Sequence, residues 1–325
     1  MSNAVRNIVL ATALVAATGL SFAARQGSNS PLANPLAISA IADSGRTQAF
    51  MGTVQFKVTN NSNEIVKVPY WQLPGASQEG KMFQVLRDGK PVDYLGPMIK
   101  RAPPTEAELV SFQPHETKVM RVDLSQSYDL SRGGNYTINF ASFLDGARTA
   151  SGRRVADANG RMASLHSVPL TLWVDDASPL RSLQIGNRPG STAPVLSNGV
   201  NYTKCTSTQI TNAAAGLAQA RTYSENGKGY LAGNKQGARY TTWFGAYTSS
   251  RYATVNQHFV NIDSKMDQSG GQITIDCGCK KSYYAYVYPT QPYKIYVCKA
   301  FWSAPTAGTD SKGGTLIHEM SHFNV

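Results

Sequence analysis

Cysteine is scarce in this 325-residue chain, and all four cysteines come late, at Cys205, Cys277, Cys279 and Cys298. A disulfide-rich scaffold is therefore excluded for the part of the chain before Cys205. A hydrophobic content of 42%, with 28 Gly and 16 Pro, suits a globular β-rich protein and argues against global disorder. The length is sufficient for two ordinary domains.

Acidic residues are also few, since 20 Asp and Glu stand against 31 Lys and Arg, which gives a formal net charge of +11. No run of basic residues is longer than two, as at Arg153-Arg154 and Lys280-Lys281. We therefore interpret the charge as dispersed over the surface and expect no nucleic-acid partner.

Long apolar runs are absent, because no stretch reaches the roughly 18 residues that a membrane span requires. The N-terminus instead has Arg6, a short apolar run from Ile8 to Ala17, and Ser21-Phe22-Ala23. This order of positive, apolar and small residues is typical of a secretory signal peptide. We expect residues 1–23 to be that peptide, no membrane partner, and a secreted mature protein.

The next part of the chain has the pattern of short strands. Residues 24–46 are rich in Ser, Ala, Asn and Pro and are expected to form a flexible leader. Short segments such as Thr53–Val58 then alternate apolar and polar residues between turn signals. Asp88-Gly89 predicts a tight hairpin. We predict an immunoglobulin-like β-sandwich over residues 47–175.

Residues 176–200 are rich in Pro, Gly, Ser and Asn, which predicts a linker with a processing site. In residues 201–325, some segments repeat apolar residues at helical spacing and others alternate as strands do, which predicts an α+β domain. Helices are expected at an Ala-rich run within Thr206–Asn226 and at Ser249–Met266, where apolar residues recur at helical spacing. Strands are expected at Gln272–Cys277, Tyr284–Tyr288 and Lys294–Cys298.

The last residues contain the pattern His-Glu-x-x-His, from His318 to His322. Positions four apart share one face of a helix, so His318 and His322 can both direct an imidazole nitrogen at a single Zn²⁺. Glu319 lies beside them, where it can take a proton from water that the metal acidifies. The pattern predicts a helix after Thr309-Asp310-Ser311, whose side chains offer N-cap oxygens, and one zinc ion per chain.

In an exported protein, an even number of clustered cysteines indicates disulfides. A bond from Cys277 to Cys279 across one glycine would be strained, which leaves two pairings open. We favour Cys205–Cys277 with Cys279–Cys298 over the pairing that exchanges Cys277 and Cys279. A zinc site at Cys277-Gly278-Cys279 is disfavoured, since its spacing is not Cys-x-x-Cys.

With these residues in view, 201–325 resembles the deuterolysin-type aspzincin metalloendopeptidases, especially their peptidyl-Lys metalloendopeptidase branch. Besides the zinc motif, the matching segments are Arg239–Gly245, Asp276–Cys279, Ala285–Pro289, Cys298–Pro305 and Gly308–Phe323. The resemblance implies the favoured disulfide pairing and a zincin catalytic domain. It also implies that the β-sandwich is a propeptide that assists folding and acts as the intramolecular inhibitor of the enzyme.

The family binds zinc through a third ligand, an Asp in a Gly-Thr-x-x-Asp motif after the second His. This sequence reaches Val325 before such a motif. A zincin needs three protein ligands and water, so we expect the third ligand beyond Val325, a C-terminally truncated chain, and an incomplete site in the residues given.

The resemblance also bears on specificity, because this branch cleaves before lysine. Tyr284 falls where Lys-specific relatives have an aromatic wall of the S1′ pocket, although an ordinary strand aromatic would fit as well. No Lys occurs between Lys118 and Lys204. A strictly Lys-directed enzyme could not cut its own linker, so either another protease cuts there, at Arg181 or Arg188, or the specificity is broader.

Two hypotheses follow. The first is a secreted zinc endopeptidase made as a zymogen, which hydrolyses protein or peptide substrates with Glu319 as the general base and lysine at P1′. The second is a secreted β-sandwich binding or adhesion protein whose zincin domain is degenerate and not catalytic.

Overall fold

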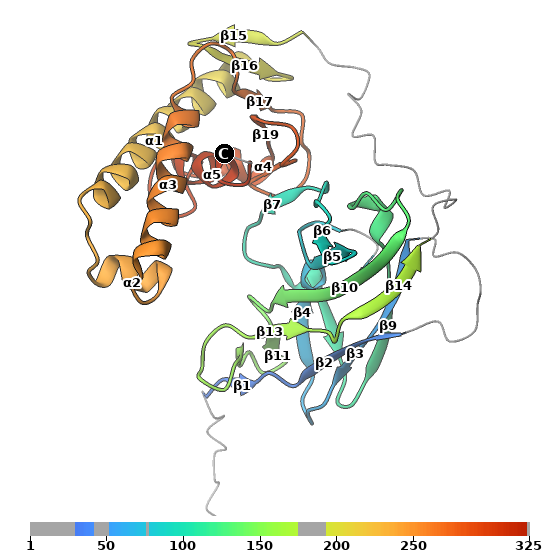
Figure 1. Ribbon diagram of the computed structural model, residues 1–325. Helices are drawn as coiled ribbons and strands as arrows, with labels where there is room; N and C mark the ends of the chain where they lie inside the picture. Colours follow the sequence, from blue (N-terminus) through green and yellow to red (C-terminus); the bar gives the residue numbers. More distant parts are fainter. Residues whose placement is uncertain (1–29, 42–51, 76–77, 175–192, 324–325) are drawn as a thin grey trace, which may run out of the picture. The chain divides into compact units, whose positions relative to one another are not determined.

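The computed structural model describes residues 30–41, 52–75, 78–174 and 193–323 (Figure 1). The predicted signal peptide and residues 176–192 of the predicted linker lie outside the described residues. Pro31–Val325 forms one compact unit. Within it, a β-rich part extends to Val174 and an α+β part begins at Val195. The β-rich character of the first part and the α+β character of the second are confirmed.

The β-rich part arranges its strands in several small sheets, with the orders β2-β3-β9, β13-β10-β5-β6 with β14 also on β10, β11-β4-β8, and β1-β12. The strands are β1 (Leu32–Ala33), β2 (Leu36–Ile41), β3 (Thr53–Asn60), β4 (Val66–Pro69), β5 (Phe83–Arg87), β6 (Lys90–Pro91), β7 (Met98–Lys100), β8 (Leu109–Phe112), β9 (Thr117–Asp123), β10 (Gly134–Phe143), β11 (Arg148–Thr149), β12 (Val155–Ala156), β13 (Ser164–His166) and β14 (Leu170–Val174).

One hydrophobic core joins these strands. Along β3 every second side chain is buried, as the period of two predicts. Phe56 of β3 is fully buried and its ring lies 5.7 Å from that of Phe83 and 6.0 Å from that of Phe140. The predicted hairpin at Asp88-Gly89 is confirmed, because both residues have positive φ and connect β5 to β6.

The flexible leader is corrected for Leu36–Ile41, which form β2 and pair antiparallel with β3. Leu36 and Ile38 are buried in the core of the β-rich part. The small residues Ala37, Ser39 and Ala40 of the same strand hide the alternation, because they are neither strongly polar nor strongly apolar.

The α+β part combines helices with a six-stranded sheet of order β15-β16-β17-β19-β18-β7. Strands β16, β17 and β19 are parallel, whereas β18 runs antiparallel to β19. Helix α1 packs against both α3 and α5 (Figure 1). The elements are β15 (Val195–Ser197), β16 (Val200–Thr203), α1 (Ser207–Ala232), α2 (Ala238–Phe244), α3 (Ser249–Met266), β17 (Thr274–Asp276), β18 (Ala285–Val287), β19 (Lys294–Val297), α4 (Lys299–Ser303) and α5 (Lys312–Met320).

Two features of this sheet differ from the sequence-based prediction. Strand β15 lies within the predicted linker, because Asn198-Gly199, both at positive φ, turns it back onto β16 as a hairpin. The sixth strand, β7, comes from the β-rich part of the chain and pairs with β18.

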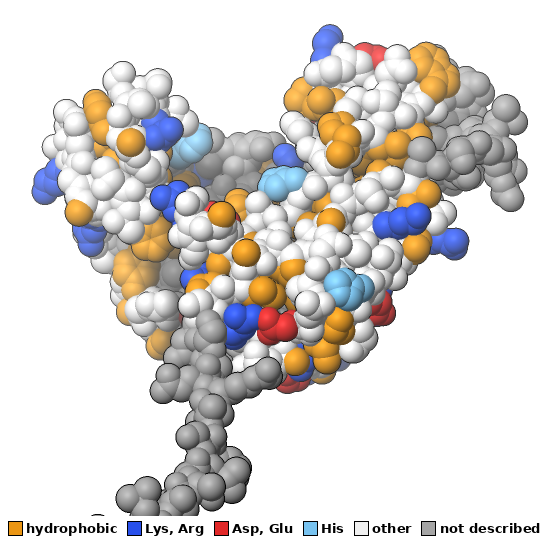
Figure 2. Space-filling model, turned by 90° about the horizontal axis from the view of Figure 1, so that it is seen from below, with side chains coloured by type: hydrophobic (Ala, Val, Ile, Leu, Met, Phe, Trp, Pro, Cys, Tyr) orange, Lys and Arg blue, Asp and Glu red, His pale blue; other side chains and the backbone are white. Residues whose placement is uncertain are grey.

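Among the described residues, none of the helices has the length and apolar character needed to cross a bilayer. On the face of the molecule shown in Figure 2, Lys and Arg side chains are scattered among uncharged ones rather than gathered in one patch.

Candidate active site

Helix α5 carries His318 and Glu319, the first two functional residues of the His-Glu-x-x-His pattern, and its position is fixed by its N-cap and by its buried face. The predicted N-cap is Ser311, whose Oγ accepts a hydrogen bond from the Gly314 amide at 3.0 Å. Leu316 and Met320 are fully buried. The helix lies close to α1, since a Cβ atom at Gly313 would meet the Gln219 side chain at 2.8 Å. A larger side chain at Gly313 would therefore push α5 and α1 apart.

His318 and His322 converge, although not on one regular helix as expected. Helix α5 ends at Met320, and the His322 amide donates to the Glu319 carbonyl at 3.2 Å, in the tighter spacing of a 3₁₀ turn. The two Nε2 atoms are 3.1 Å apart. The tighter turn therefore preserves the convergence that the spacing predicted.

This arrangement fits two ligands of a zinc ion. Tetrahedral coordination with Zn–N bonds of about 2.0–2.1 Å places two ligand nitrogens about 3.3–3.4 Å apart, close to the separation seen. Zinc binds neutral imidazole. Burial, the neighbouring His322 and the charge of Lys100 lower the pKa of His318 to about 4, and burial also lowers that of His322. Among the described residues, no set of three His, Cys, Asp or Glu side chains comes together as a metal site. The predicted third ligand, beyond Val325, lies outside them.

Glu319 points into the protein beside the two histidines. It is fully buried, and neither carboxylate oxygen completes a hydrogen bond within the described part of the chain. Burial raises the pKa of Glu319 to about 8, while the charge and the backbone amide of Lys100 act in the opposite direction. A buried carboxyl group without a partner is costly, so this group has the character of a functional residue rather than a structural one.

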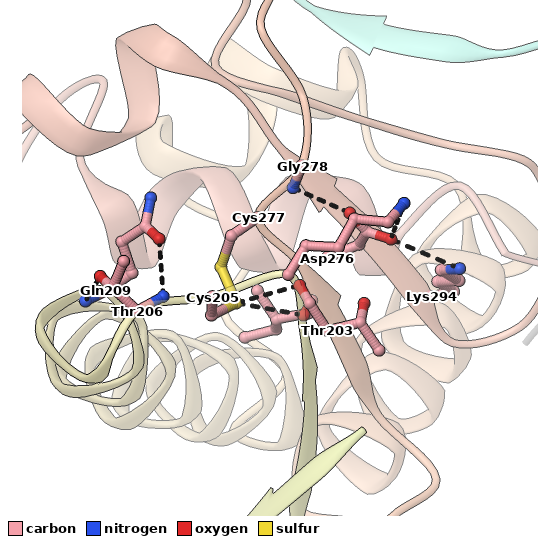
Figure 3. Close-up of a disulfide and its surroundings, with 10 residues drawn as sticks. Thr203, Cys205, Thr206, Gln209, Asp276, Cys277, Gly278 and Lys294 are labelled. Carbon is pink, nitrogen blue, oxygen red and sulfur yellow. Dashed lines mark hydrogen bonds and ion pairs between the residues drawn. A yellow bond between two sulfur atoms is a disulfide. The ribbon is translucent and has the colours of Figure 1, made fainter. Parts of the chain in front are cut away.

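The four cysteines support the sheet below α5. The structure pairs Cys205 with Cys277 and Cys279 with Cys298, which confirms the favoured pairing. Figure 3 shows the first disulfide between the start of α1 and the end of β17. Next to it, the buried Asp276 carboxylate lies 3.4 Å from Lys204 Nζ and 3.6 Å from Lys294 Nζ.

Tyr284 immediately precedes β18 and contacts a residue that sequence reasoning did not single out. Its amide donates to the Lys100 carbonyl at 3.1 Å, and Lys100 Nζ lies 5.3 Å from the centre of its ring. Lys100 Nζ also forms an ion pair with Asp310 Oδ1 at 3.0 Å. Nothing in the sequence around Lys100 indicates these contacts, because its partners are about 200 positions away.

The chain is similar to several known peptidases. Residues 230–325 match the family model Aspzincin_M35, described as lysine-specific metallo-endopeptidase. An extracellular protease of Aeromonas hydrophila is 40% identical over 274 residues, which cover 84% of this chain and 76% of that protein. A peptidyl-Lys metalloendopeptidase of Grifola frondosa is 30% identical over 286 residues, 84% of this chain and 69% of that protein.

A solved zinc peptidase from Grifola frondosa has 43% identity over 37% of this chain and 72% of its own, with a TM-score of 0.34. The matches to the Aeromonas and Grifola proteases, each at least 30% identical and covering more than two thirds of both chains, show that this protein belongs to the aspzincin metallopeptidases, a family of zinc-dependent peptidases.

Proposed function

We propose that the protein is a secreted zinc endopeptidase made as a zymogen, in which His318 and His322 hold one zinc ion and Glu319 is the general base. The observation that carries the proposal is the 3.1 Å separation of the two imidazole nitrogens beside a buried carboxylate that lacks a partner. The third protein ligand that a zincin requires would complete the site.

Zinc, when bound, polarises the carbonyl of the bond to be cut and acidifies the water that attacks it. Glu319 takes a proton from that water and delivers it to the nitrogen of the leaving amine. General acid–base help of this kind contributes roughly 10²–10⁴ in rate. A cation held by His318 and His322 would act against the burial that raises the pKa of Glu319, and would favour the ionised carboxylate.

Residues 47–175 are proposed as an immunoglobulin-like propeptide that inhibits the enzyme, and 176–200 as the linker that is cut. Secretion is supported by the N-terminal signal pattern and by the name of the Aeromonas relative. Cleavage before lysine is supported by the name of the Grifola relative and by Tyr284 as an S1′ wall. The alternative, an adhesion protein with a degenerate zincin domain, is not favoured, since both relatives that match over the two parts carry peptidase names.

The test compares Glu319→Gln with His318→Ala in the complete protein. We expect Glu319→Gln to keep bound zinc, measured by atomic absorption, and to lose casein hydrolysis by at least about 10²-fold. His318→Ala should lose both. Full casein hydrolysis by Glu319→Gln would contradict the proposal.

A further inference from the structure

The buried polar residues of the α5 region form two pairs that differ in their hydrogen bonds. At the start of the helix, the Ser311 hydroxyl accepts a hydrogen bond from a backbone amide, and the Lys312 ammonium group donates to a backbone carbonyl. One turn further on, Thr315 and Glu319 are both fully buried. The Thr315 hydroxyl and both Glu319 carboxylate oxygens complete no hydrogen bond within the described part of the chain. The second pair therefore consists of polar groups that the fold itself does not satisfy.

Thr315 differs in this respect from other threonines in helices of this protein. A threonine inside a helix commonly donates its hydroxyl to the carbonyl four residues before it. Four threonines of α1, α2 and α3 make this bond, and they are Thr211, Thr222, Thr242 and Thr254. For Thr315 the corresponding carbonyl, that of Ser311, accepts the Thr315 amide at 2.8 Å but not the hydroxyl. The helix therefore leaves the Thr315 hydroxyl available to another group.

The nearest candidate along the helix is Glu319. Residues four positions apart on a helix differ by about 40° around its axis and by about 6 Å along it. A long side chain in a helix leans toward the N-terminus, over the residues three and four positions before it. The Glu319 side chain therefore leans over Thr315. His318 is three positions after Thr315, so Thr315 lies directly beneath the first two residues of the zinc motif.

The two groups are complementary as donor and acceptor. An ionised carboxylate only accepts hydrogen bonds, and a hydroxyl offers one donor. A buried polar group without a partner costs stability, and a hydrogen bond to a charged group is stronger than one between neutral groups. One bond between Thr315 and Glu319 would satisfy both residues. It would use one carboxylate oxygen and leave the other free to take a proton from water.

From this arrangement, and resting on the proposed function, we infer that Thr315 is a positioning residue for peptide hydrolysis. In the working enzyme its hydroxyl donates to one oxygen of the Glu319 carboxylate and fixes the rotamer of that side chain, so that the other oxygen faces the attacking water. Thr315 acts through Glu319 and contacts neither the substrate nor the metal.

The first experiment removes the hydroxyl with little change of shape, by Thr315→Val in the zinc-loaded, processed enzyme, with a casein-derived peptide as substrate. We expect kcat to fall about 10- to 100-fold, the equivalent of one hydrogen bond to a charged group. KM should stay within about twofold, because the lost interaction serves the chemical step and not substrate binding.

Thr203→Val is the matched control for this substitution. Thr203 of β16 is also buried, and its hydroxyl also lacks a partner among the described residues. It lies in register with Asp276 of β17 and not on the zinc-motif helix. Thr203→Val should leave kcat unchanged. Equal kcat in Thr315→Val and Thr203→Val would overturn the inference.

The second experiment repeats the comparison in a smaller side chain. Thr315→Ser and Thr315→Ala both lose the methyl group, but only the serine variant keeps the hydroxyl. Thr315→Ser should keep kcat within about threefold of the wild type, and Thr315→Ala should fall about 10- to 100-fold below it. Equal kcat in the two variants would overturn the inference even if Thr315→Val failed to fold.

Stability distinguishes a positioning role from a structural one. Because the Thr315 hydroxyl has no partner in the described, zinc-free fold, Thr315→Val should not lower the thermal unfolding midpoint of zinc-free protein. The zinc-loaded variant should also keep its bound zinc, measured by atomic absorption. A lower midpoint or a loss of zinc, in parallel with the loss of activity, would assign the loss to the fold and overturn the inference.

Glu319→Gln in the same peptide assay separates the inference from the proposed function. If Glu319→Gln loses hydrolysis and Thr315→Val does not, the inference is overturned and the proposed function stands. If Glu319→Gln keeps full hydrolysis, the proposed function fails, and the role of Thr315 fails with it.

Discussion

The β-rich part and the α+β part of this chain stabilise their cores by different means. The core of the β-rich part consists of side chains from many short strands, with Phe56, Phe83 and Phe140 in contact at its centre. Its described residues include no cysteine. The α+β part uses fewer strands, two disulfides and a close contact between α1 and α5. It also buries the carboxylate of Glu319. Thus the part with the unfavourable buried charge is the one that is cross-linked.

The strongest way to test this comparison is the pH dependence of stability in zinc-free protein. Burial raises the pKa of Glu319 from 4.5 to about 8 in the folded state. The folded state therefore holds this proton more tightly than the unfolded state. Glu319 therefore contributes stability to the α+β part that is fully present below pH 4.5 and is lost as the pH rises to about 8.

The full difference amounts to about 5 kcal/mol, from about 1.4 kcal/mol per pKa unit. About three quarters of it falls between pH 5 and pH 8, where denaturant unfolding measures it. Glu319→Gln, which cannot ionise, should remove this fall in stability, and the β-rich part should not share it. If Glu319→Gln lost the same stability with rising pH, the pH dependence would arise from another titratable group.

The second test removes the cross-links. The Cys205–Cys277 disulfide spans 72 positions and the Cys279–Cys298 disulfide spans 19. The chain-entropy model gives a loss of about 4 kcal/mol without the first and about 3 kcal/mol without the second. Paired Cys→Ser variants, followed by thermal unfolding and hydrogen exchange, should show the loss in the α+β part. Equal loss of protection in the β-rich part would mean that the two cores unfold together.

The third test, which has the smallest expected effect on stability, compares a matched pair of substitutions. Ile138 in β10 and Ile275 in β17 are both fully buried. Ile→Val removes one methylene group and should cost about 0.5–1.5 kcal/mol at each site. Hydrogen exchange should place the loss from Ile138→Val in the β-rich part and that from Ile275→Val in the α+β part. If either variant lowered hydrogen-exchange protection in both parts, the two cores could not be regarded as separate.

Local patterns carried the sequence-based prediction a considerable way. The bounds of α3 agree with the prediction at both ends, and Ser311 caps α5 as expected. His318 and His322 could be chosen as candidate zinc ligands because their spacing along the chain determines their spacing in space. Whether the β-rich part is an immunoglobulin-like propeptide stays a prediction.

The features that the sequence did not predict depend on contacts between residues that are far apart in the chain. Lys100 and Asp310 are 210 positions apart. Strand β7 has only three residues, too few to reveal a period, and its partner strand β18 is equally short. The short helices α2 and α4 were missed for the same reason. Strand β2 was missed because small residues weaken its alternation.

The contacts of Arg101 bear on how the proposed zymogen would be activated. In the β-rich part, the Arg101 guanidinium lies over the Trp71 ring and pairs with Glu79. Arg101 and Glu79 also contact Tyr283 of the α+β part. A cut in the linker would break the covalent connection between the two parts but not these contacts. If the β-rich part inhibits the enzyme as proposed, the two products of the cut would be a noncovalent enzyme–inhibitor pair. Their separation is a dissociation equilibrium, so activity after processing should rise on dilution and fall again when the released β-rich part is added back.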